Sequence, residues 1–406
     1  MQISVLRKLD KYIGPFICNF LLFIRMFFLT VKRDERISLQ QNHKNILVVK
    51  FFGMGTIFLA SPALMKLKDK YPDANITIMT LLANRECCEV LPSIDNVICI
   101  NIDNFSAFIH TSFAALRNIR KREIDLVLDF EFLSKFSAMI SLLTSFFSPK
   151  KLIIGFDSPI KWRNSVYDKT VSFEHNGHIT KIFYKFLNCL GMNGCEVSFE
   201  AERLAMVKCA ENKYLDVSVK TKDSIENNDN SSFISVNINS GVLDHNRRWP
   251  KEYYSVLIRE LVKNPNKVVL LIGGRGDVDY VSGLEEELPS TQQIINLCGK
   301  SSFKQLVGIL IKSKLLITND SGPLHIAMAL GIPTISFFGP ETPSLYGPVS
   351  GEYHVFYKNI YCSPCLNIYN TKNSDCKNNE CLKLIKPGEV LELIKSKWGQ
   401  NERFVV

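Results

Sequence analysis

The turn NDSG at residues 319–322 is the part of the sequence best suited to bind an anion. It lies between an apolar run, LLIT at 315–318, that predicts a strand, and a segment at 324–330 that predicts a helix. Pro323 suits the first turn of that helix, and Gly331 is placed to end it. The free N–H groups and the positive dipole end of the helix would face the carboxyl edge of the strand, which favours a phosphate or pyrophosphate.

The same residues also fit a purely structural interpretation. Asp320 and Ser321 are residue types whose side-chain oxygens cap helices, so the segment also fits a well-capped helix that binds nothing. His325, on the predicted helix, is by itself more typical of a core or capping histidine than of a catalytic one. The residues alone leave both interpretations open.

Four of the twelve cysteines are grouped near the C-terminus with the spacing C-x2-C-x10-C-x4-C. They are Cys362, Cys365, Cys376 and Cys381. Four thiols with a two-residue gap are compatible with a structural, tetrahedral zinc site. Disulfides and merely packed thiols are the alternatives. The other cysteines are scattered, which is typical of buried thiols in a reduced compartment.

Positive charge is concentrated at the N-terminus of the chain. The 406 residues hold 49 Lys and Arg against 40 Asp and Glu, a net charge of +9, and seven basic and three acidic groups in residues 1–36 contribute +4 of it. Between the basic clusters, residues 12–31 are rich in Phe and Leu but are interrupted by Arg25. We therefore predict a membrane-associating segment over 1–40, with a helix in the headgroup plane favoured over a true span. A packed helix and a secretory signal are further alternatives.

The rest of the chain alternates short apolar runs with helical lengths, which is typical of parallel strands joined by crossover helices. Strands are predicted at 46–50, 76–79, 97–100, 125–130 and 151–156, and again at 233–238, 267–274, 315–318 and 334–339. A polar stretch at 216–232 predicts a linker. We therefore predict an α/β fold with two Rossmann-like domains facing a cleft, over 45–215 and 233–395.

Composition excludes several classes of protein. With 46% apolar and 22% charged residues, the chain is an ordinary globular protein, and one long apolar run does not fit a multi-span membrane protein. No dense basic stripe with interleaved aromatic residues predicts a nucleic-acid partner. A nucleotide-dependent oxidoreductase or epimerase is disfavoured, because FFGMGT at 51–56 is a poor substitute for G-x-G-x-x-G.

The segment DSGPLH at 320–325, followed by ALGIPTISFFGP, resembles the signature of glycosyltransferase family 9, the bacterial heptosyltransferases of lipopolysaccharide core synthesis. Three more segments resemble the family in the same order along the chain. Residues 46–72 resemble its opening strand, loop and helix, 246–261 its basic-Trp-Pro helix start, and 295–323 the strand and helix before the signature. The resemblance covers about 45–390.

The resemblance implies a GT-B fold, with a nucleotide-sugar donor on the C-terminal domain and the acceptor on the N-terminal one. It implies inverting, metal-independent transfer that requires no cofactor for catalysis. By this resemblance the donor pyrophosphate would lie against the signature, on the backbone of Ser321, Gly322, Leu324 and His325. The remaining signature residues, Asp320 and Pro323, belong to the same expected donor site.

Two charged residues outside the signature are expected at the donor. Arg247 matches the basic residue two positions before Trp-Pro in the family, where a guanidinium would neutralise charge on the leaving nucleotide diphosphate. A solvated basic pair of Arg247 and Arg248 is the alternative. Asp277, which follows a Gly-Gly pair at the end of a predicted strand, is expected to reach the donor ribose.

The sequence departs from the family in the loop that holds Gly53 and Gly55. The family usually carries an acid directly after its glycine, taken to be the general base, whereas Thr56 follows Gly55 here. A hydroxyl does not accept a proton at neutral pH as a carboxylate does. Asp129 and Glu131, after the strand at 125–130, are the nearest candidates for a relocated base. Thr56 acting only on acceptor position, loss of the reaction, and a capping or solvent-facing role for the two acids remain alternatives.

We therefore expect an inverting glycosyltransferase that moves a sugar, heptose from ADP-heptose by the resemblance, onto a lipopolysaccharide core or related lipid-linked glycan. The segment at 1–40 would hold it at the cytoplasmic face of the bacterial inner membrane as a peripheral or monotopic protein. A non-catalytic homologue that binds nucleotide sugar or glycan is the alternative, because of Thr56.

Overall fold

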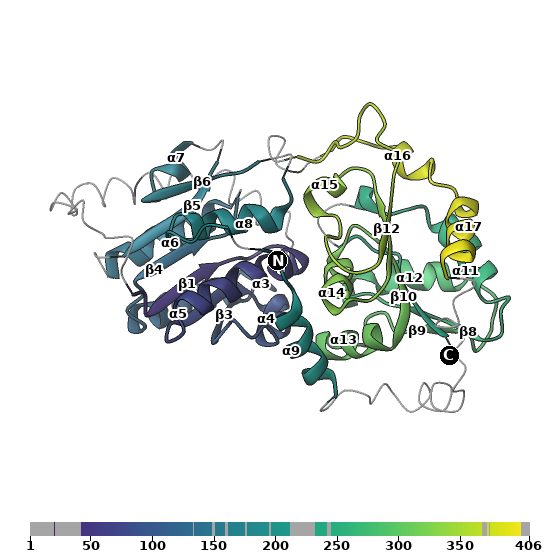
Figure 1. Cartoon of the computed structure of the whole chain (residues 1–406), viewed down its shortest axis with the longest axis horizontal. Helices are drawn as coiled ribbons and strands as arrows, with labels where there is room; N and C mark the ends of the chain where they lie inside the picture. The colour runs from purple at the N-terminus through teal and green to yellow at the C-terminus, as the bar shows by residue number, and fades with distance from the viewer. Residues whose placement is uncertain are drawn as a thin grey trace. The chain divides into compact units, whose positions relative to one another are not determined.

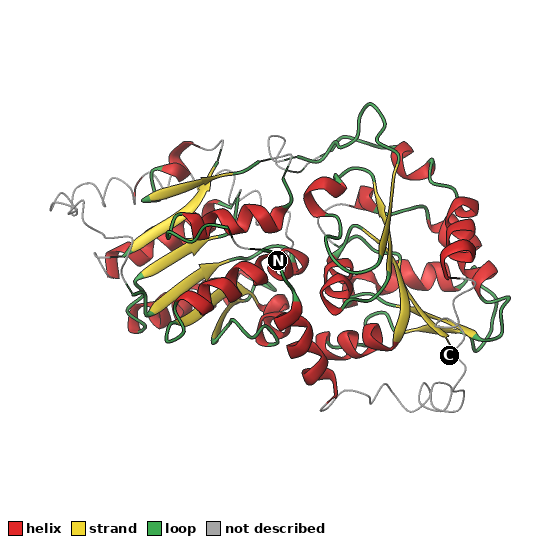
Figure 2. Ribbon diagram, in the orientation of Figure 1, coloured by secondary structure: helices red, strands yellow, loops and turns green. Residues whose placement is uncertain are grey.

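Two six-stranded parallel sheets form the framework of the chain, one in the unit Met1–Ala201 and one in the unit Glu202–Val406 (Figure 1). Helices accompany each sheet, as the prediction of two parallel-sheet α/β domains requires, and that prediction is confirmed (Figure 2). The structure is a computed structural model that describes residues 20, 42–132, 134–147, 151–158, 161–174, 177–194, 196–211, 232–241, 245–367, 372 and 374–398.

The first sheet has the strand order β3-β2-β1-β4-β5-β6. Its strands are β1 (Asn45–Val49), β2 (Asn75–Leu81), β3 (Asn96–Ile100), β4 (Leu126–Asp129), β5 (Leu152–Asp157) and β6 (Lys169–Ser172). Its helices are α3 (Met54–Lys70), α4 (Arg85–Glu89), α5 (Phe105–Lys121), α6 (Lys135–Phe147), α7 (Lys161–Asn164) and α8 (Ile179–Asn188). Leu47 and Val48 point to opposite faces of β1 and both are fully buried, so both faces of this sheet are covered.

The second sheet repeats this topology with the order β12-β11-β10-β7-β8-β9. Its strands are β7 (Ser232–Asn237), β8 (Lys267–Leu271), β9 (Ile294–Asn296), β10 (Ser313–Asn319), β11 (Thr334–Phe338) and β12 (Tyr353–Tyr357). Its helices are α11 (Lys251–Leu261), α12 (Val278–Glu285), α13 (Phe303–Lys312), α14 (Gly322–Leu330), α15 (Pro343–Tyr346), α16 (Glu380–Lys383) and α17 (Pro387–Trp398), and α9 (Glu200–Glu211) crosses the division between the units.

Both sheets therefore have a topological switch point, where the strand order reverses. It lies between β1 and β4 in the first sheet and between β7 and β10 in the second, and in each case the two strands pair in parallel. Loops that leave the carboxyl ends of such a strand pair diverge, and ligands of open α/β sheets bind there. In each domain, the carboxyl edge of the sheet at the switch point is therefore where a ligand is expected.

Three strands, β6, β9 and β12, were not in the predicted set, and all three lie at sheet edges. β6 has a single buried residue, Val171, and β9 and β12 have none, so none of them produces the apolar run that predicted the inner strands. The predicted strand over 267–274 ends at Leu271.

The predicted end of the first domain, at residue 215, lies outside the described residues. The first unit of the structure ends at Ala201. The predicted linker at 216–232 lies outside the described residues, except for Ser232, which begins β7.

The predicted membrane-associating segment at 1–40 lies outside the described residues apart from Phe20, so its role stays a prediction. Among the residues that the structure describes, none of the helices combines the length and the apolar character needed to cross a bilayer.

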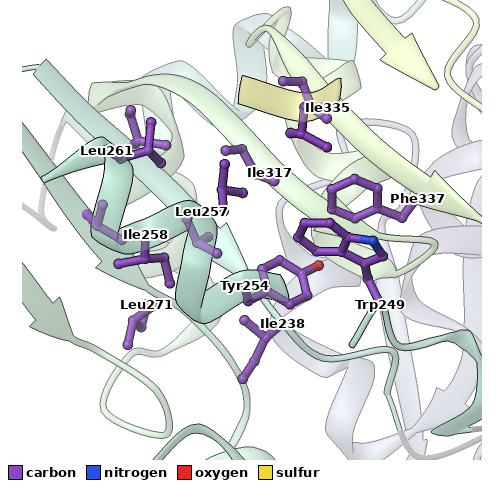
Figure 3. Close-up of a cluster of buried hydrophobic side chains, with 14 of the residues drawn as sticks. Ile238, Trp249, Tyr254, Leu257, Ile258, Leu261, Leu271, Ile317, Ile335 and Phe337 are labelled. Carbon is purple, nitrogen blue, oxygen red and sulfur yellow. The ribbon is translucent and has the colours of Figure 1, made fainter. Parts of the chain in front are cut away.

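The core of the second unit is organised around Trp249, which is fully buried (Figure 3). Its ring stacks on Phe337 of β11 with centroids 4.3 Å apart and an angle of 17° between the planes. Tyr254 of α11 meets the same indole edge-on at 4.8 Å. Leu257 and Ile258 continue the buried face of α11 over the sheet. The indole therefore joins the start of α11 to the centre of the sheet.

A buried lysine beside the first sheet yields a pH-dependent prediction. Lys151 precedes β5, and its Nζ donates a hydrogen bond to the carbonyl of Thr144. Burial lowers the pKa of Lys151 from 10.5 to about 8, because it disfavours the charged amine. Between these values the unfolded chain binds more protons than the folded one, so stability rises with pH through this window.

We therefore expect Lys151→Met to improve the free energy of unfolding, relative to wild type, more at about pH 7 than at about pH 10, as measured by urea unfolding. Lys66→Met removes an exposed lysine of α3 and serves as the control, with no such pH dependence expected. An equal effect of Lys151→Met at both pH values would contradict the prediction.

Candidate functional site

Polar side chains join the carboxyl ends of β7 and β10 at the switch point of the second sheet. Asn237, the last residue of β7, donates from Nδ2 to the hydroxyl of Thr318 at 3.0 Å and to that of Ser321 at 2.9 Å. The two hydroxyl oxygens are themselves 2.9 Å apart. The predicted NDSG turn is therefore held by the neighbouring strand as well as by its own helix.

The start of α14 is not capped in the way that the structural interpretation required. Ser321 is the N-cap residue, but its side chain makes no capping hydrogen bond to the helix. The carboxylate of Asp320 is directed to an arginine instead. The N–H of Leu324 donates to the carbonyl of Ser321 at 3.2 Å, and Gly322 and Pro323 form the first positions of the helix. The side-chain cap that the structural interpretation required is therefore absent from the start of α14.

Arg247 is the arginine that Asp320 meets. Its Nη1 donates to Asp320 Oδ2 at 3.0 Å and to the carbonyl of Asp320 at 3.2 Å, and its Nη2 donates to the carbonyl of Ser240 at 2.6 Å. The two side chains are only 15% and 6% exposed. Arg247 is therefore not a solvated surface residue, and its charge is fixed beside the start of α14.

Arg248 and Asp277 lie at the next strand of the sheet. The guanidinium of Arg248 stacks on Tyr280 at 4.0 Å from the ring centroid, and its Nη2 lies 3.7 Å from Asp277 Oδ1. The other oxygen of Asp277 accepts the N–H of Gly274 at 3.0 Å and so closes the turn after β8. Both oxygens of Asp277 have protein partners, and the predicted contact with a ribose stays a prediction.

Trp249 explains why Arg247 and Arg248 occupy these positions. Its backbone N–H donates to Oδ1 of Asn319 at 2.8 Å, and its indole Nε1 donates to the carbonyl of Ile385 at 2.9 Å. These bonds, together with the stacking shown in Figure 3, fix the segment before α11 against the end of β10. The predicted His325 is buried on α14.

The sequence missed a buried ion pair near this site. Glu341 follows β11, and its Oε2 lies 2.6 Å from Nζ of Lys372, which also donates to the hydroxyl of Tyr346 at 2.8 Å. Burial raises the pKa of Glu341, and the charge of Lys372 opposes that shift. The position of Glu341 was predictable, because it comes three residues after the end of β11, behind Gly339-Pro340. Its partner Lys372 is distant in sequence and was not predictable.

The corresponding loop of the first domain runs from β1 to α3, and Glu131 holds it. Oε1 of Glu131 accepts the N–H groups of Phe51 and Phe52, each at 2.7 Å, and Nζ of Lys50 at 3.0 Å. Asn84 donates to the carbonyl of Phe51 at 2.9 Å. Glu131 is only 6% exposed, so its observed contacts are structural ones within this loop.

Thr56 also acts on this loop. Its hydroxyl donates to the carbonyl of Gly53 at 2.7 Å and lies 3.2 Å from that of Phe52. Gly53 has a φ of +82°, and a Cβ there would approach the hydroxyl of Thr56 to 2.7 Å. Glycine is therefore required at this position, while Gly55 is a buried residue of the first turn of α3.

Asp129 is fully buried at the end of β4. Its Oδ2 accepts hydrogen bonds from Tyr167 at 2.6 Å, Ser137 at 2.9 Å and Arg163 at 3.2 Å, and its Oδ1 accepts the N–H of Glu131 at 3.0 Å. Burial raises the pKa of Asp129, and Arg163 opposes that shift. With no exposed surface, Asp129 is not accessible to an acceptor hydroxyl, which argues against the prediction that it supplies a relocated base.

The four C-terminal cysteines of the predicted zinc site are all described in the structure. Cys362, Cys365, Cys376 and Cys381 are free thiols, and the described residues contain no cluster of three or more His, Cys, Asp or Glu side chains arranged around a metal. Cys381 is buried, which raises the pKa of its thiol to about 11, whereas Cys362 is exposed. The predicted zinc site at these four cysteines therefore stays a prediction.

Comparison with known protein sequences finds a family that matches this chain. Residues 113–374 match the model of glycosyltransferase family 9 (heptosyltransferase). Lipooligosaccharide heptosyltransferase 2 of Campylobacter jejuni is 26% identical over 151 residues, which are 37% of this chain and 46% of that protein. Lipopolysaccharide heptosyltransferase 1 of Campylobacter coli is 25% identical over 299 residues, 71% of this chain and 81% of that protein. The chain thus spans about half the length of the first of these relatives.

The fold agrees with a solved structure. ADP-heptose lipopolysaccharide heptosyltransferase II of Escherichia coli is similar with a TM-score of 0.64 at 18% identity, over 87% of this chain and 98% of that one. The structural match supports a fold of two Rossmann-like domains. Since the family model matches more than half of its residues, the chain belongs to glycosyltransferase family 9.

Proposed function

We propose that the protein is an inverting glycosyltransferase that moves a sugar from a nucleotide diphosphate onto a lipid-linked glycan acceptor. The observation that carries this proposal is the clamp of Arg247 on Asp320 beside the uncapped start of α14. A fixed guanidinium and a helix N-terminus at one switch point are complementary to a diphosphate.

Arg247 keeps N–H donors for a ligand while it is bound to Asp320 and Ser240. Its three hydrogen bonds to protein use three N–H donors, and a guanidinium carries five in total. Because the group is already fixed, it needs little reorganisation when charge develops on the departing diphosphate. Arg247 and the start of α14 together supply charge stabilisation from the protein itself, and we propose that the reaction is metal-independent.

We propose ADP-heptose as the donor and a lipopolysaccharide core or related surface glycan as the acceptor. The support is family membership and the similarity to an ADP-heptose heptosyltransferase. Hexose and deoxysugar donors would share the same diphosphate site.

In an inverting transfer, an acceptor oxygen attacks the anomeric carbon as the bond to the diphosphate breaks, and a base takes the acceptor proton. We propose Glu131 for that base, because it lies at the β1–β4 switch point and, unlike Asp129, retains some exposure. Thr56 would then position the loop through its bonds to Gly53 and Phe52.

A non-catalytic homologue that binds nucleotide sugar is the second candidate. Its support is that Thr56 replaces the usual acid and that its hydroxyl is directed to loop carbonyls. Donor consumption by the purified protein separates the two candidates, because a binding protein is stabilised by the donor without turning it over.

We also propose that residues 1–40 associate with the cytoplasmic face of the bacterial inner membrane. The basic clusters and the Phe-rich stretch between them support this proposal. Docking would raise the local concentration of a lipid-linked acceptor.

For the donor site, we expect a screen of nucleotide sugars to stabilise the protein thermally, with ADP-heptose giving the largest shift. Arg247→Met should weaken donor binding by about 10- to 100-fold, as expected for loss of one charge-assisted contact with a phosphate. Lys263→Met removes an exposed cation of the same domain and should leave donor affinity unchanged. Donor affinity in Arg247→Met equal to that of wild type would overturn the assignment of the site.

For the base, we expect Glu131→Gln to lower kcat by about 10²- to 10⁴-fold and to remove the acid limb of the pH profile, while donor affinity is retained. Lys50→Gln disturbs the same ion pair but keeps the carboxylate, so the acid limb should persist in it. Glu89→Gln, at an exposed helical ion pair, is the matched control. An unaltered pH profile in Glu131→Gln would exclude Glu131 as the base. Its role would then be to hold the β1–α3 loop.

A further inference from the structure

Helix α5 of the first domain exposes a row of large apolar side chains. Phe105 is 60% exposed, Ile109 37% and Phe113 69%, and the spacing of four residues aligns them along one face of the helix. We call these three residues the α5 stripe. Single exposed apolar residues are ordinary, but a contiguous row that includes two phenylalanines marks an interaction surface.

The stripe is not part of the core-facing side of α5. Ala115 and Ile119 are the buried residues of this helix, and Phe108 packs on Phe136 of α6 with ring centroids 5.3 Å apart. The domain thus uses another face of α5 for its own stability. Exposure of the stripe is therefore not explained by packing within the domain.

The same exposed surface becomes basic toward the end of the helix. Arg117 continues the four-residue spacing of the stripe, and Arg120 and Lys121 follow in the last turn, all three exposed. No Asp or Glu occurs between Phe105 and Lys121. Basic residues in a last turn also complement the helix dipole, but that effect gives no reason for the exposed phenylalanines.

We propose that α5 docks on an anionic lipid surface, with the α5 stripe at the acyl boundary and Arg117, Arg120 and Lys121 at the phosphates. Apolar insertion combined with cationic attraction is the physical basis of interfacial helices. The uniform positive sign of the helix selects an anionic lipid surface over a mixed-charge protein partner. The biological role of this docking rests on the proposed function, in which the acceptor is lipid-linked. Lipid binding by α5 does not itself require sugar transfer.

The docking face is linked to the acceptor side of the first domain. α5 begins just after the carboxyl end of β3, where Asn104 caps it by accepting the N–H of Ala107 at 2.8 Å. The stripe therefore starts at the sheet edge that also carries the β1–α3 loop. The ring of Phe108 packs on that of Phe136. Phe136 in turn packs on Phe51 of that loop, with ring centroids 5.2 Å apart. Docking would thus hold the loop near the lipid surface.

The test uses the full chain with Phe113→Trp and vesicles that contain phosphatidylglycerol and phosphatidylethanolamine. We expect the added tryptophan emission to shift to shorter wavelength and to be quenched by brominated lipid, with loss of both effects at high salt and on phosphatidylcholine alone. The wild-type chain provides the baseline from its three tryptophans, of which Trp249 and Trp398 are buried.

A second variant, Phe105→Ser with Phe113→Ser, should bind these vesicles about tenfold more weakly than wild type. Leu204→Ser on α9, where the leucine is 58% exposed, is the matched control and should bind as wild type does. Residual binding of the double variant would measure the contribution of residues 1–40, and its thermal midpoint would confirm an intact fold.

Absence of lipid quenching in Phe113→Trp would overturn the proposal. Emission already shifted without vesicles would indicate that residues 1–40 or a second copy covers the stripe, and light scattering of the double-serine variant would distinguish these two occupants. Lipid quenching without any sugar transfer would instead retain the docking surface and refute the proposed function.

Discussion

The proposed donor site depends on the burial of one indole. Trp249 stacks on Phe337, and its two N–H groups bind Asn319 at the end of β10 and the carbonyl of Ile385 near the C-terminus. Three distant parts of the chain therefore converge on a single residue. Arg247, two residues earlier, reaches Asp320 only because this segment is fixed, so core packing sets the position of the charge that the proposed function uses.

The first domain has the same strand order but fixes its switch point by charge. Glu131 gathers two backbone N–H groups and the Lys50 amine on one oxygen, in addition to the packing of Phe51 on Phe136. A carboxylate with several donors holds a loop strongly, but it ties the loop conformation to one ionised group. In our proposal the same group also takes a proton, so loop order and proton transfer are coupled in this domain.

The parts of the fold that were predictable from the sequence are those set by local pattern and complete burial. Apolar runs located the inner strands, and Gly331 marked the end of α14, where it adopts the left-handed conformation. Tertiary partners were not predictable. The sequence left open a capping role for Asp320 and a solvated position for Arg247 as alternatives to a donor site, and it gave no sign of their mutual ion pair, which joins residues 73 positions apart. The pairing of Glu341 with Lys372 was invisible for the same reason.

The exposed row on α5 has a consequence for how such an enzyme would meet its acceptor. A single anchor at residues 1–40 would restrict the protein to a membrane but leave it free to rotate above the surface. A second contact through Phe105 and Phe113 would fix the orientation, and it begins at the edge of the sheet that bears the β1–α3 loop. Once one site is bound, the second binds at a high effective concentration, so the overall affinity exceeds that of either site and neither has to be strong. Reversible docking of this kind suits a transferase that must release each glycolipid after a single addition.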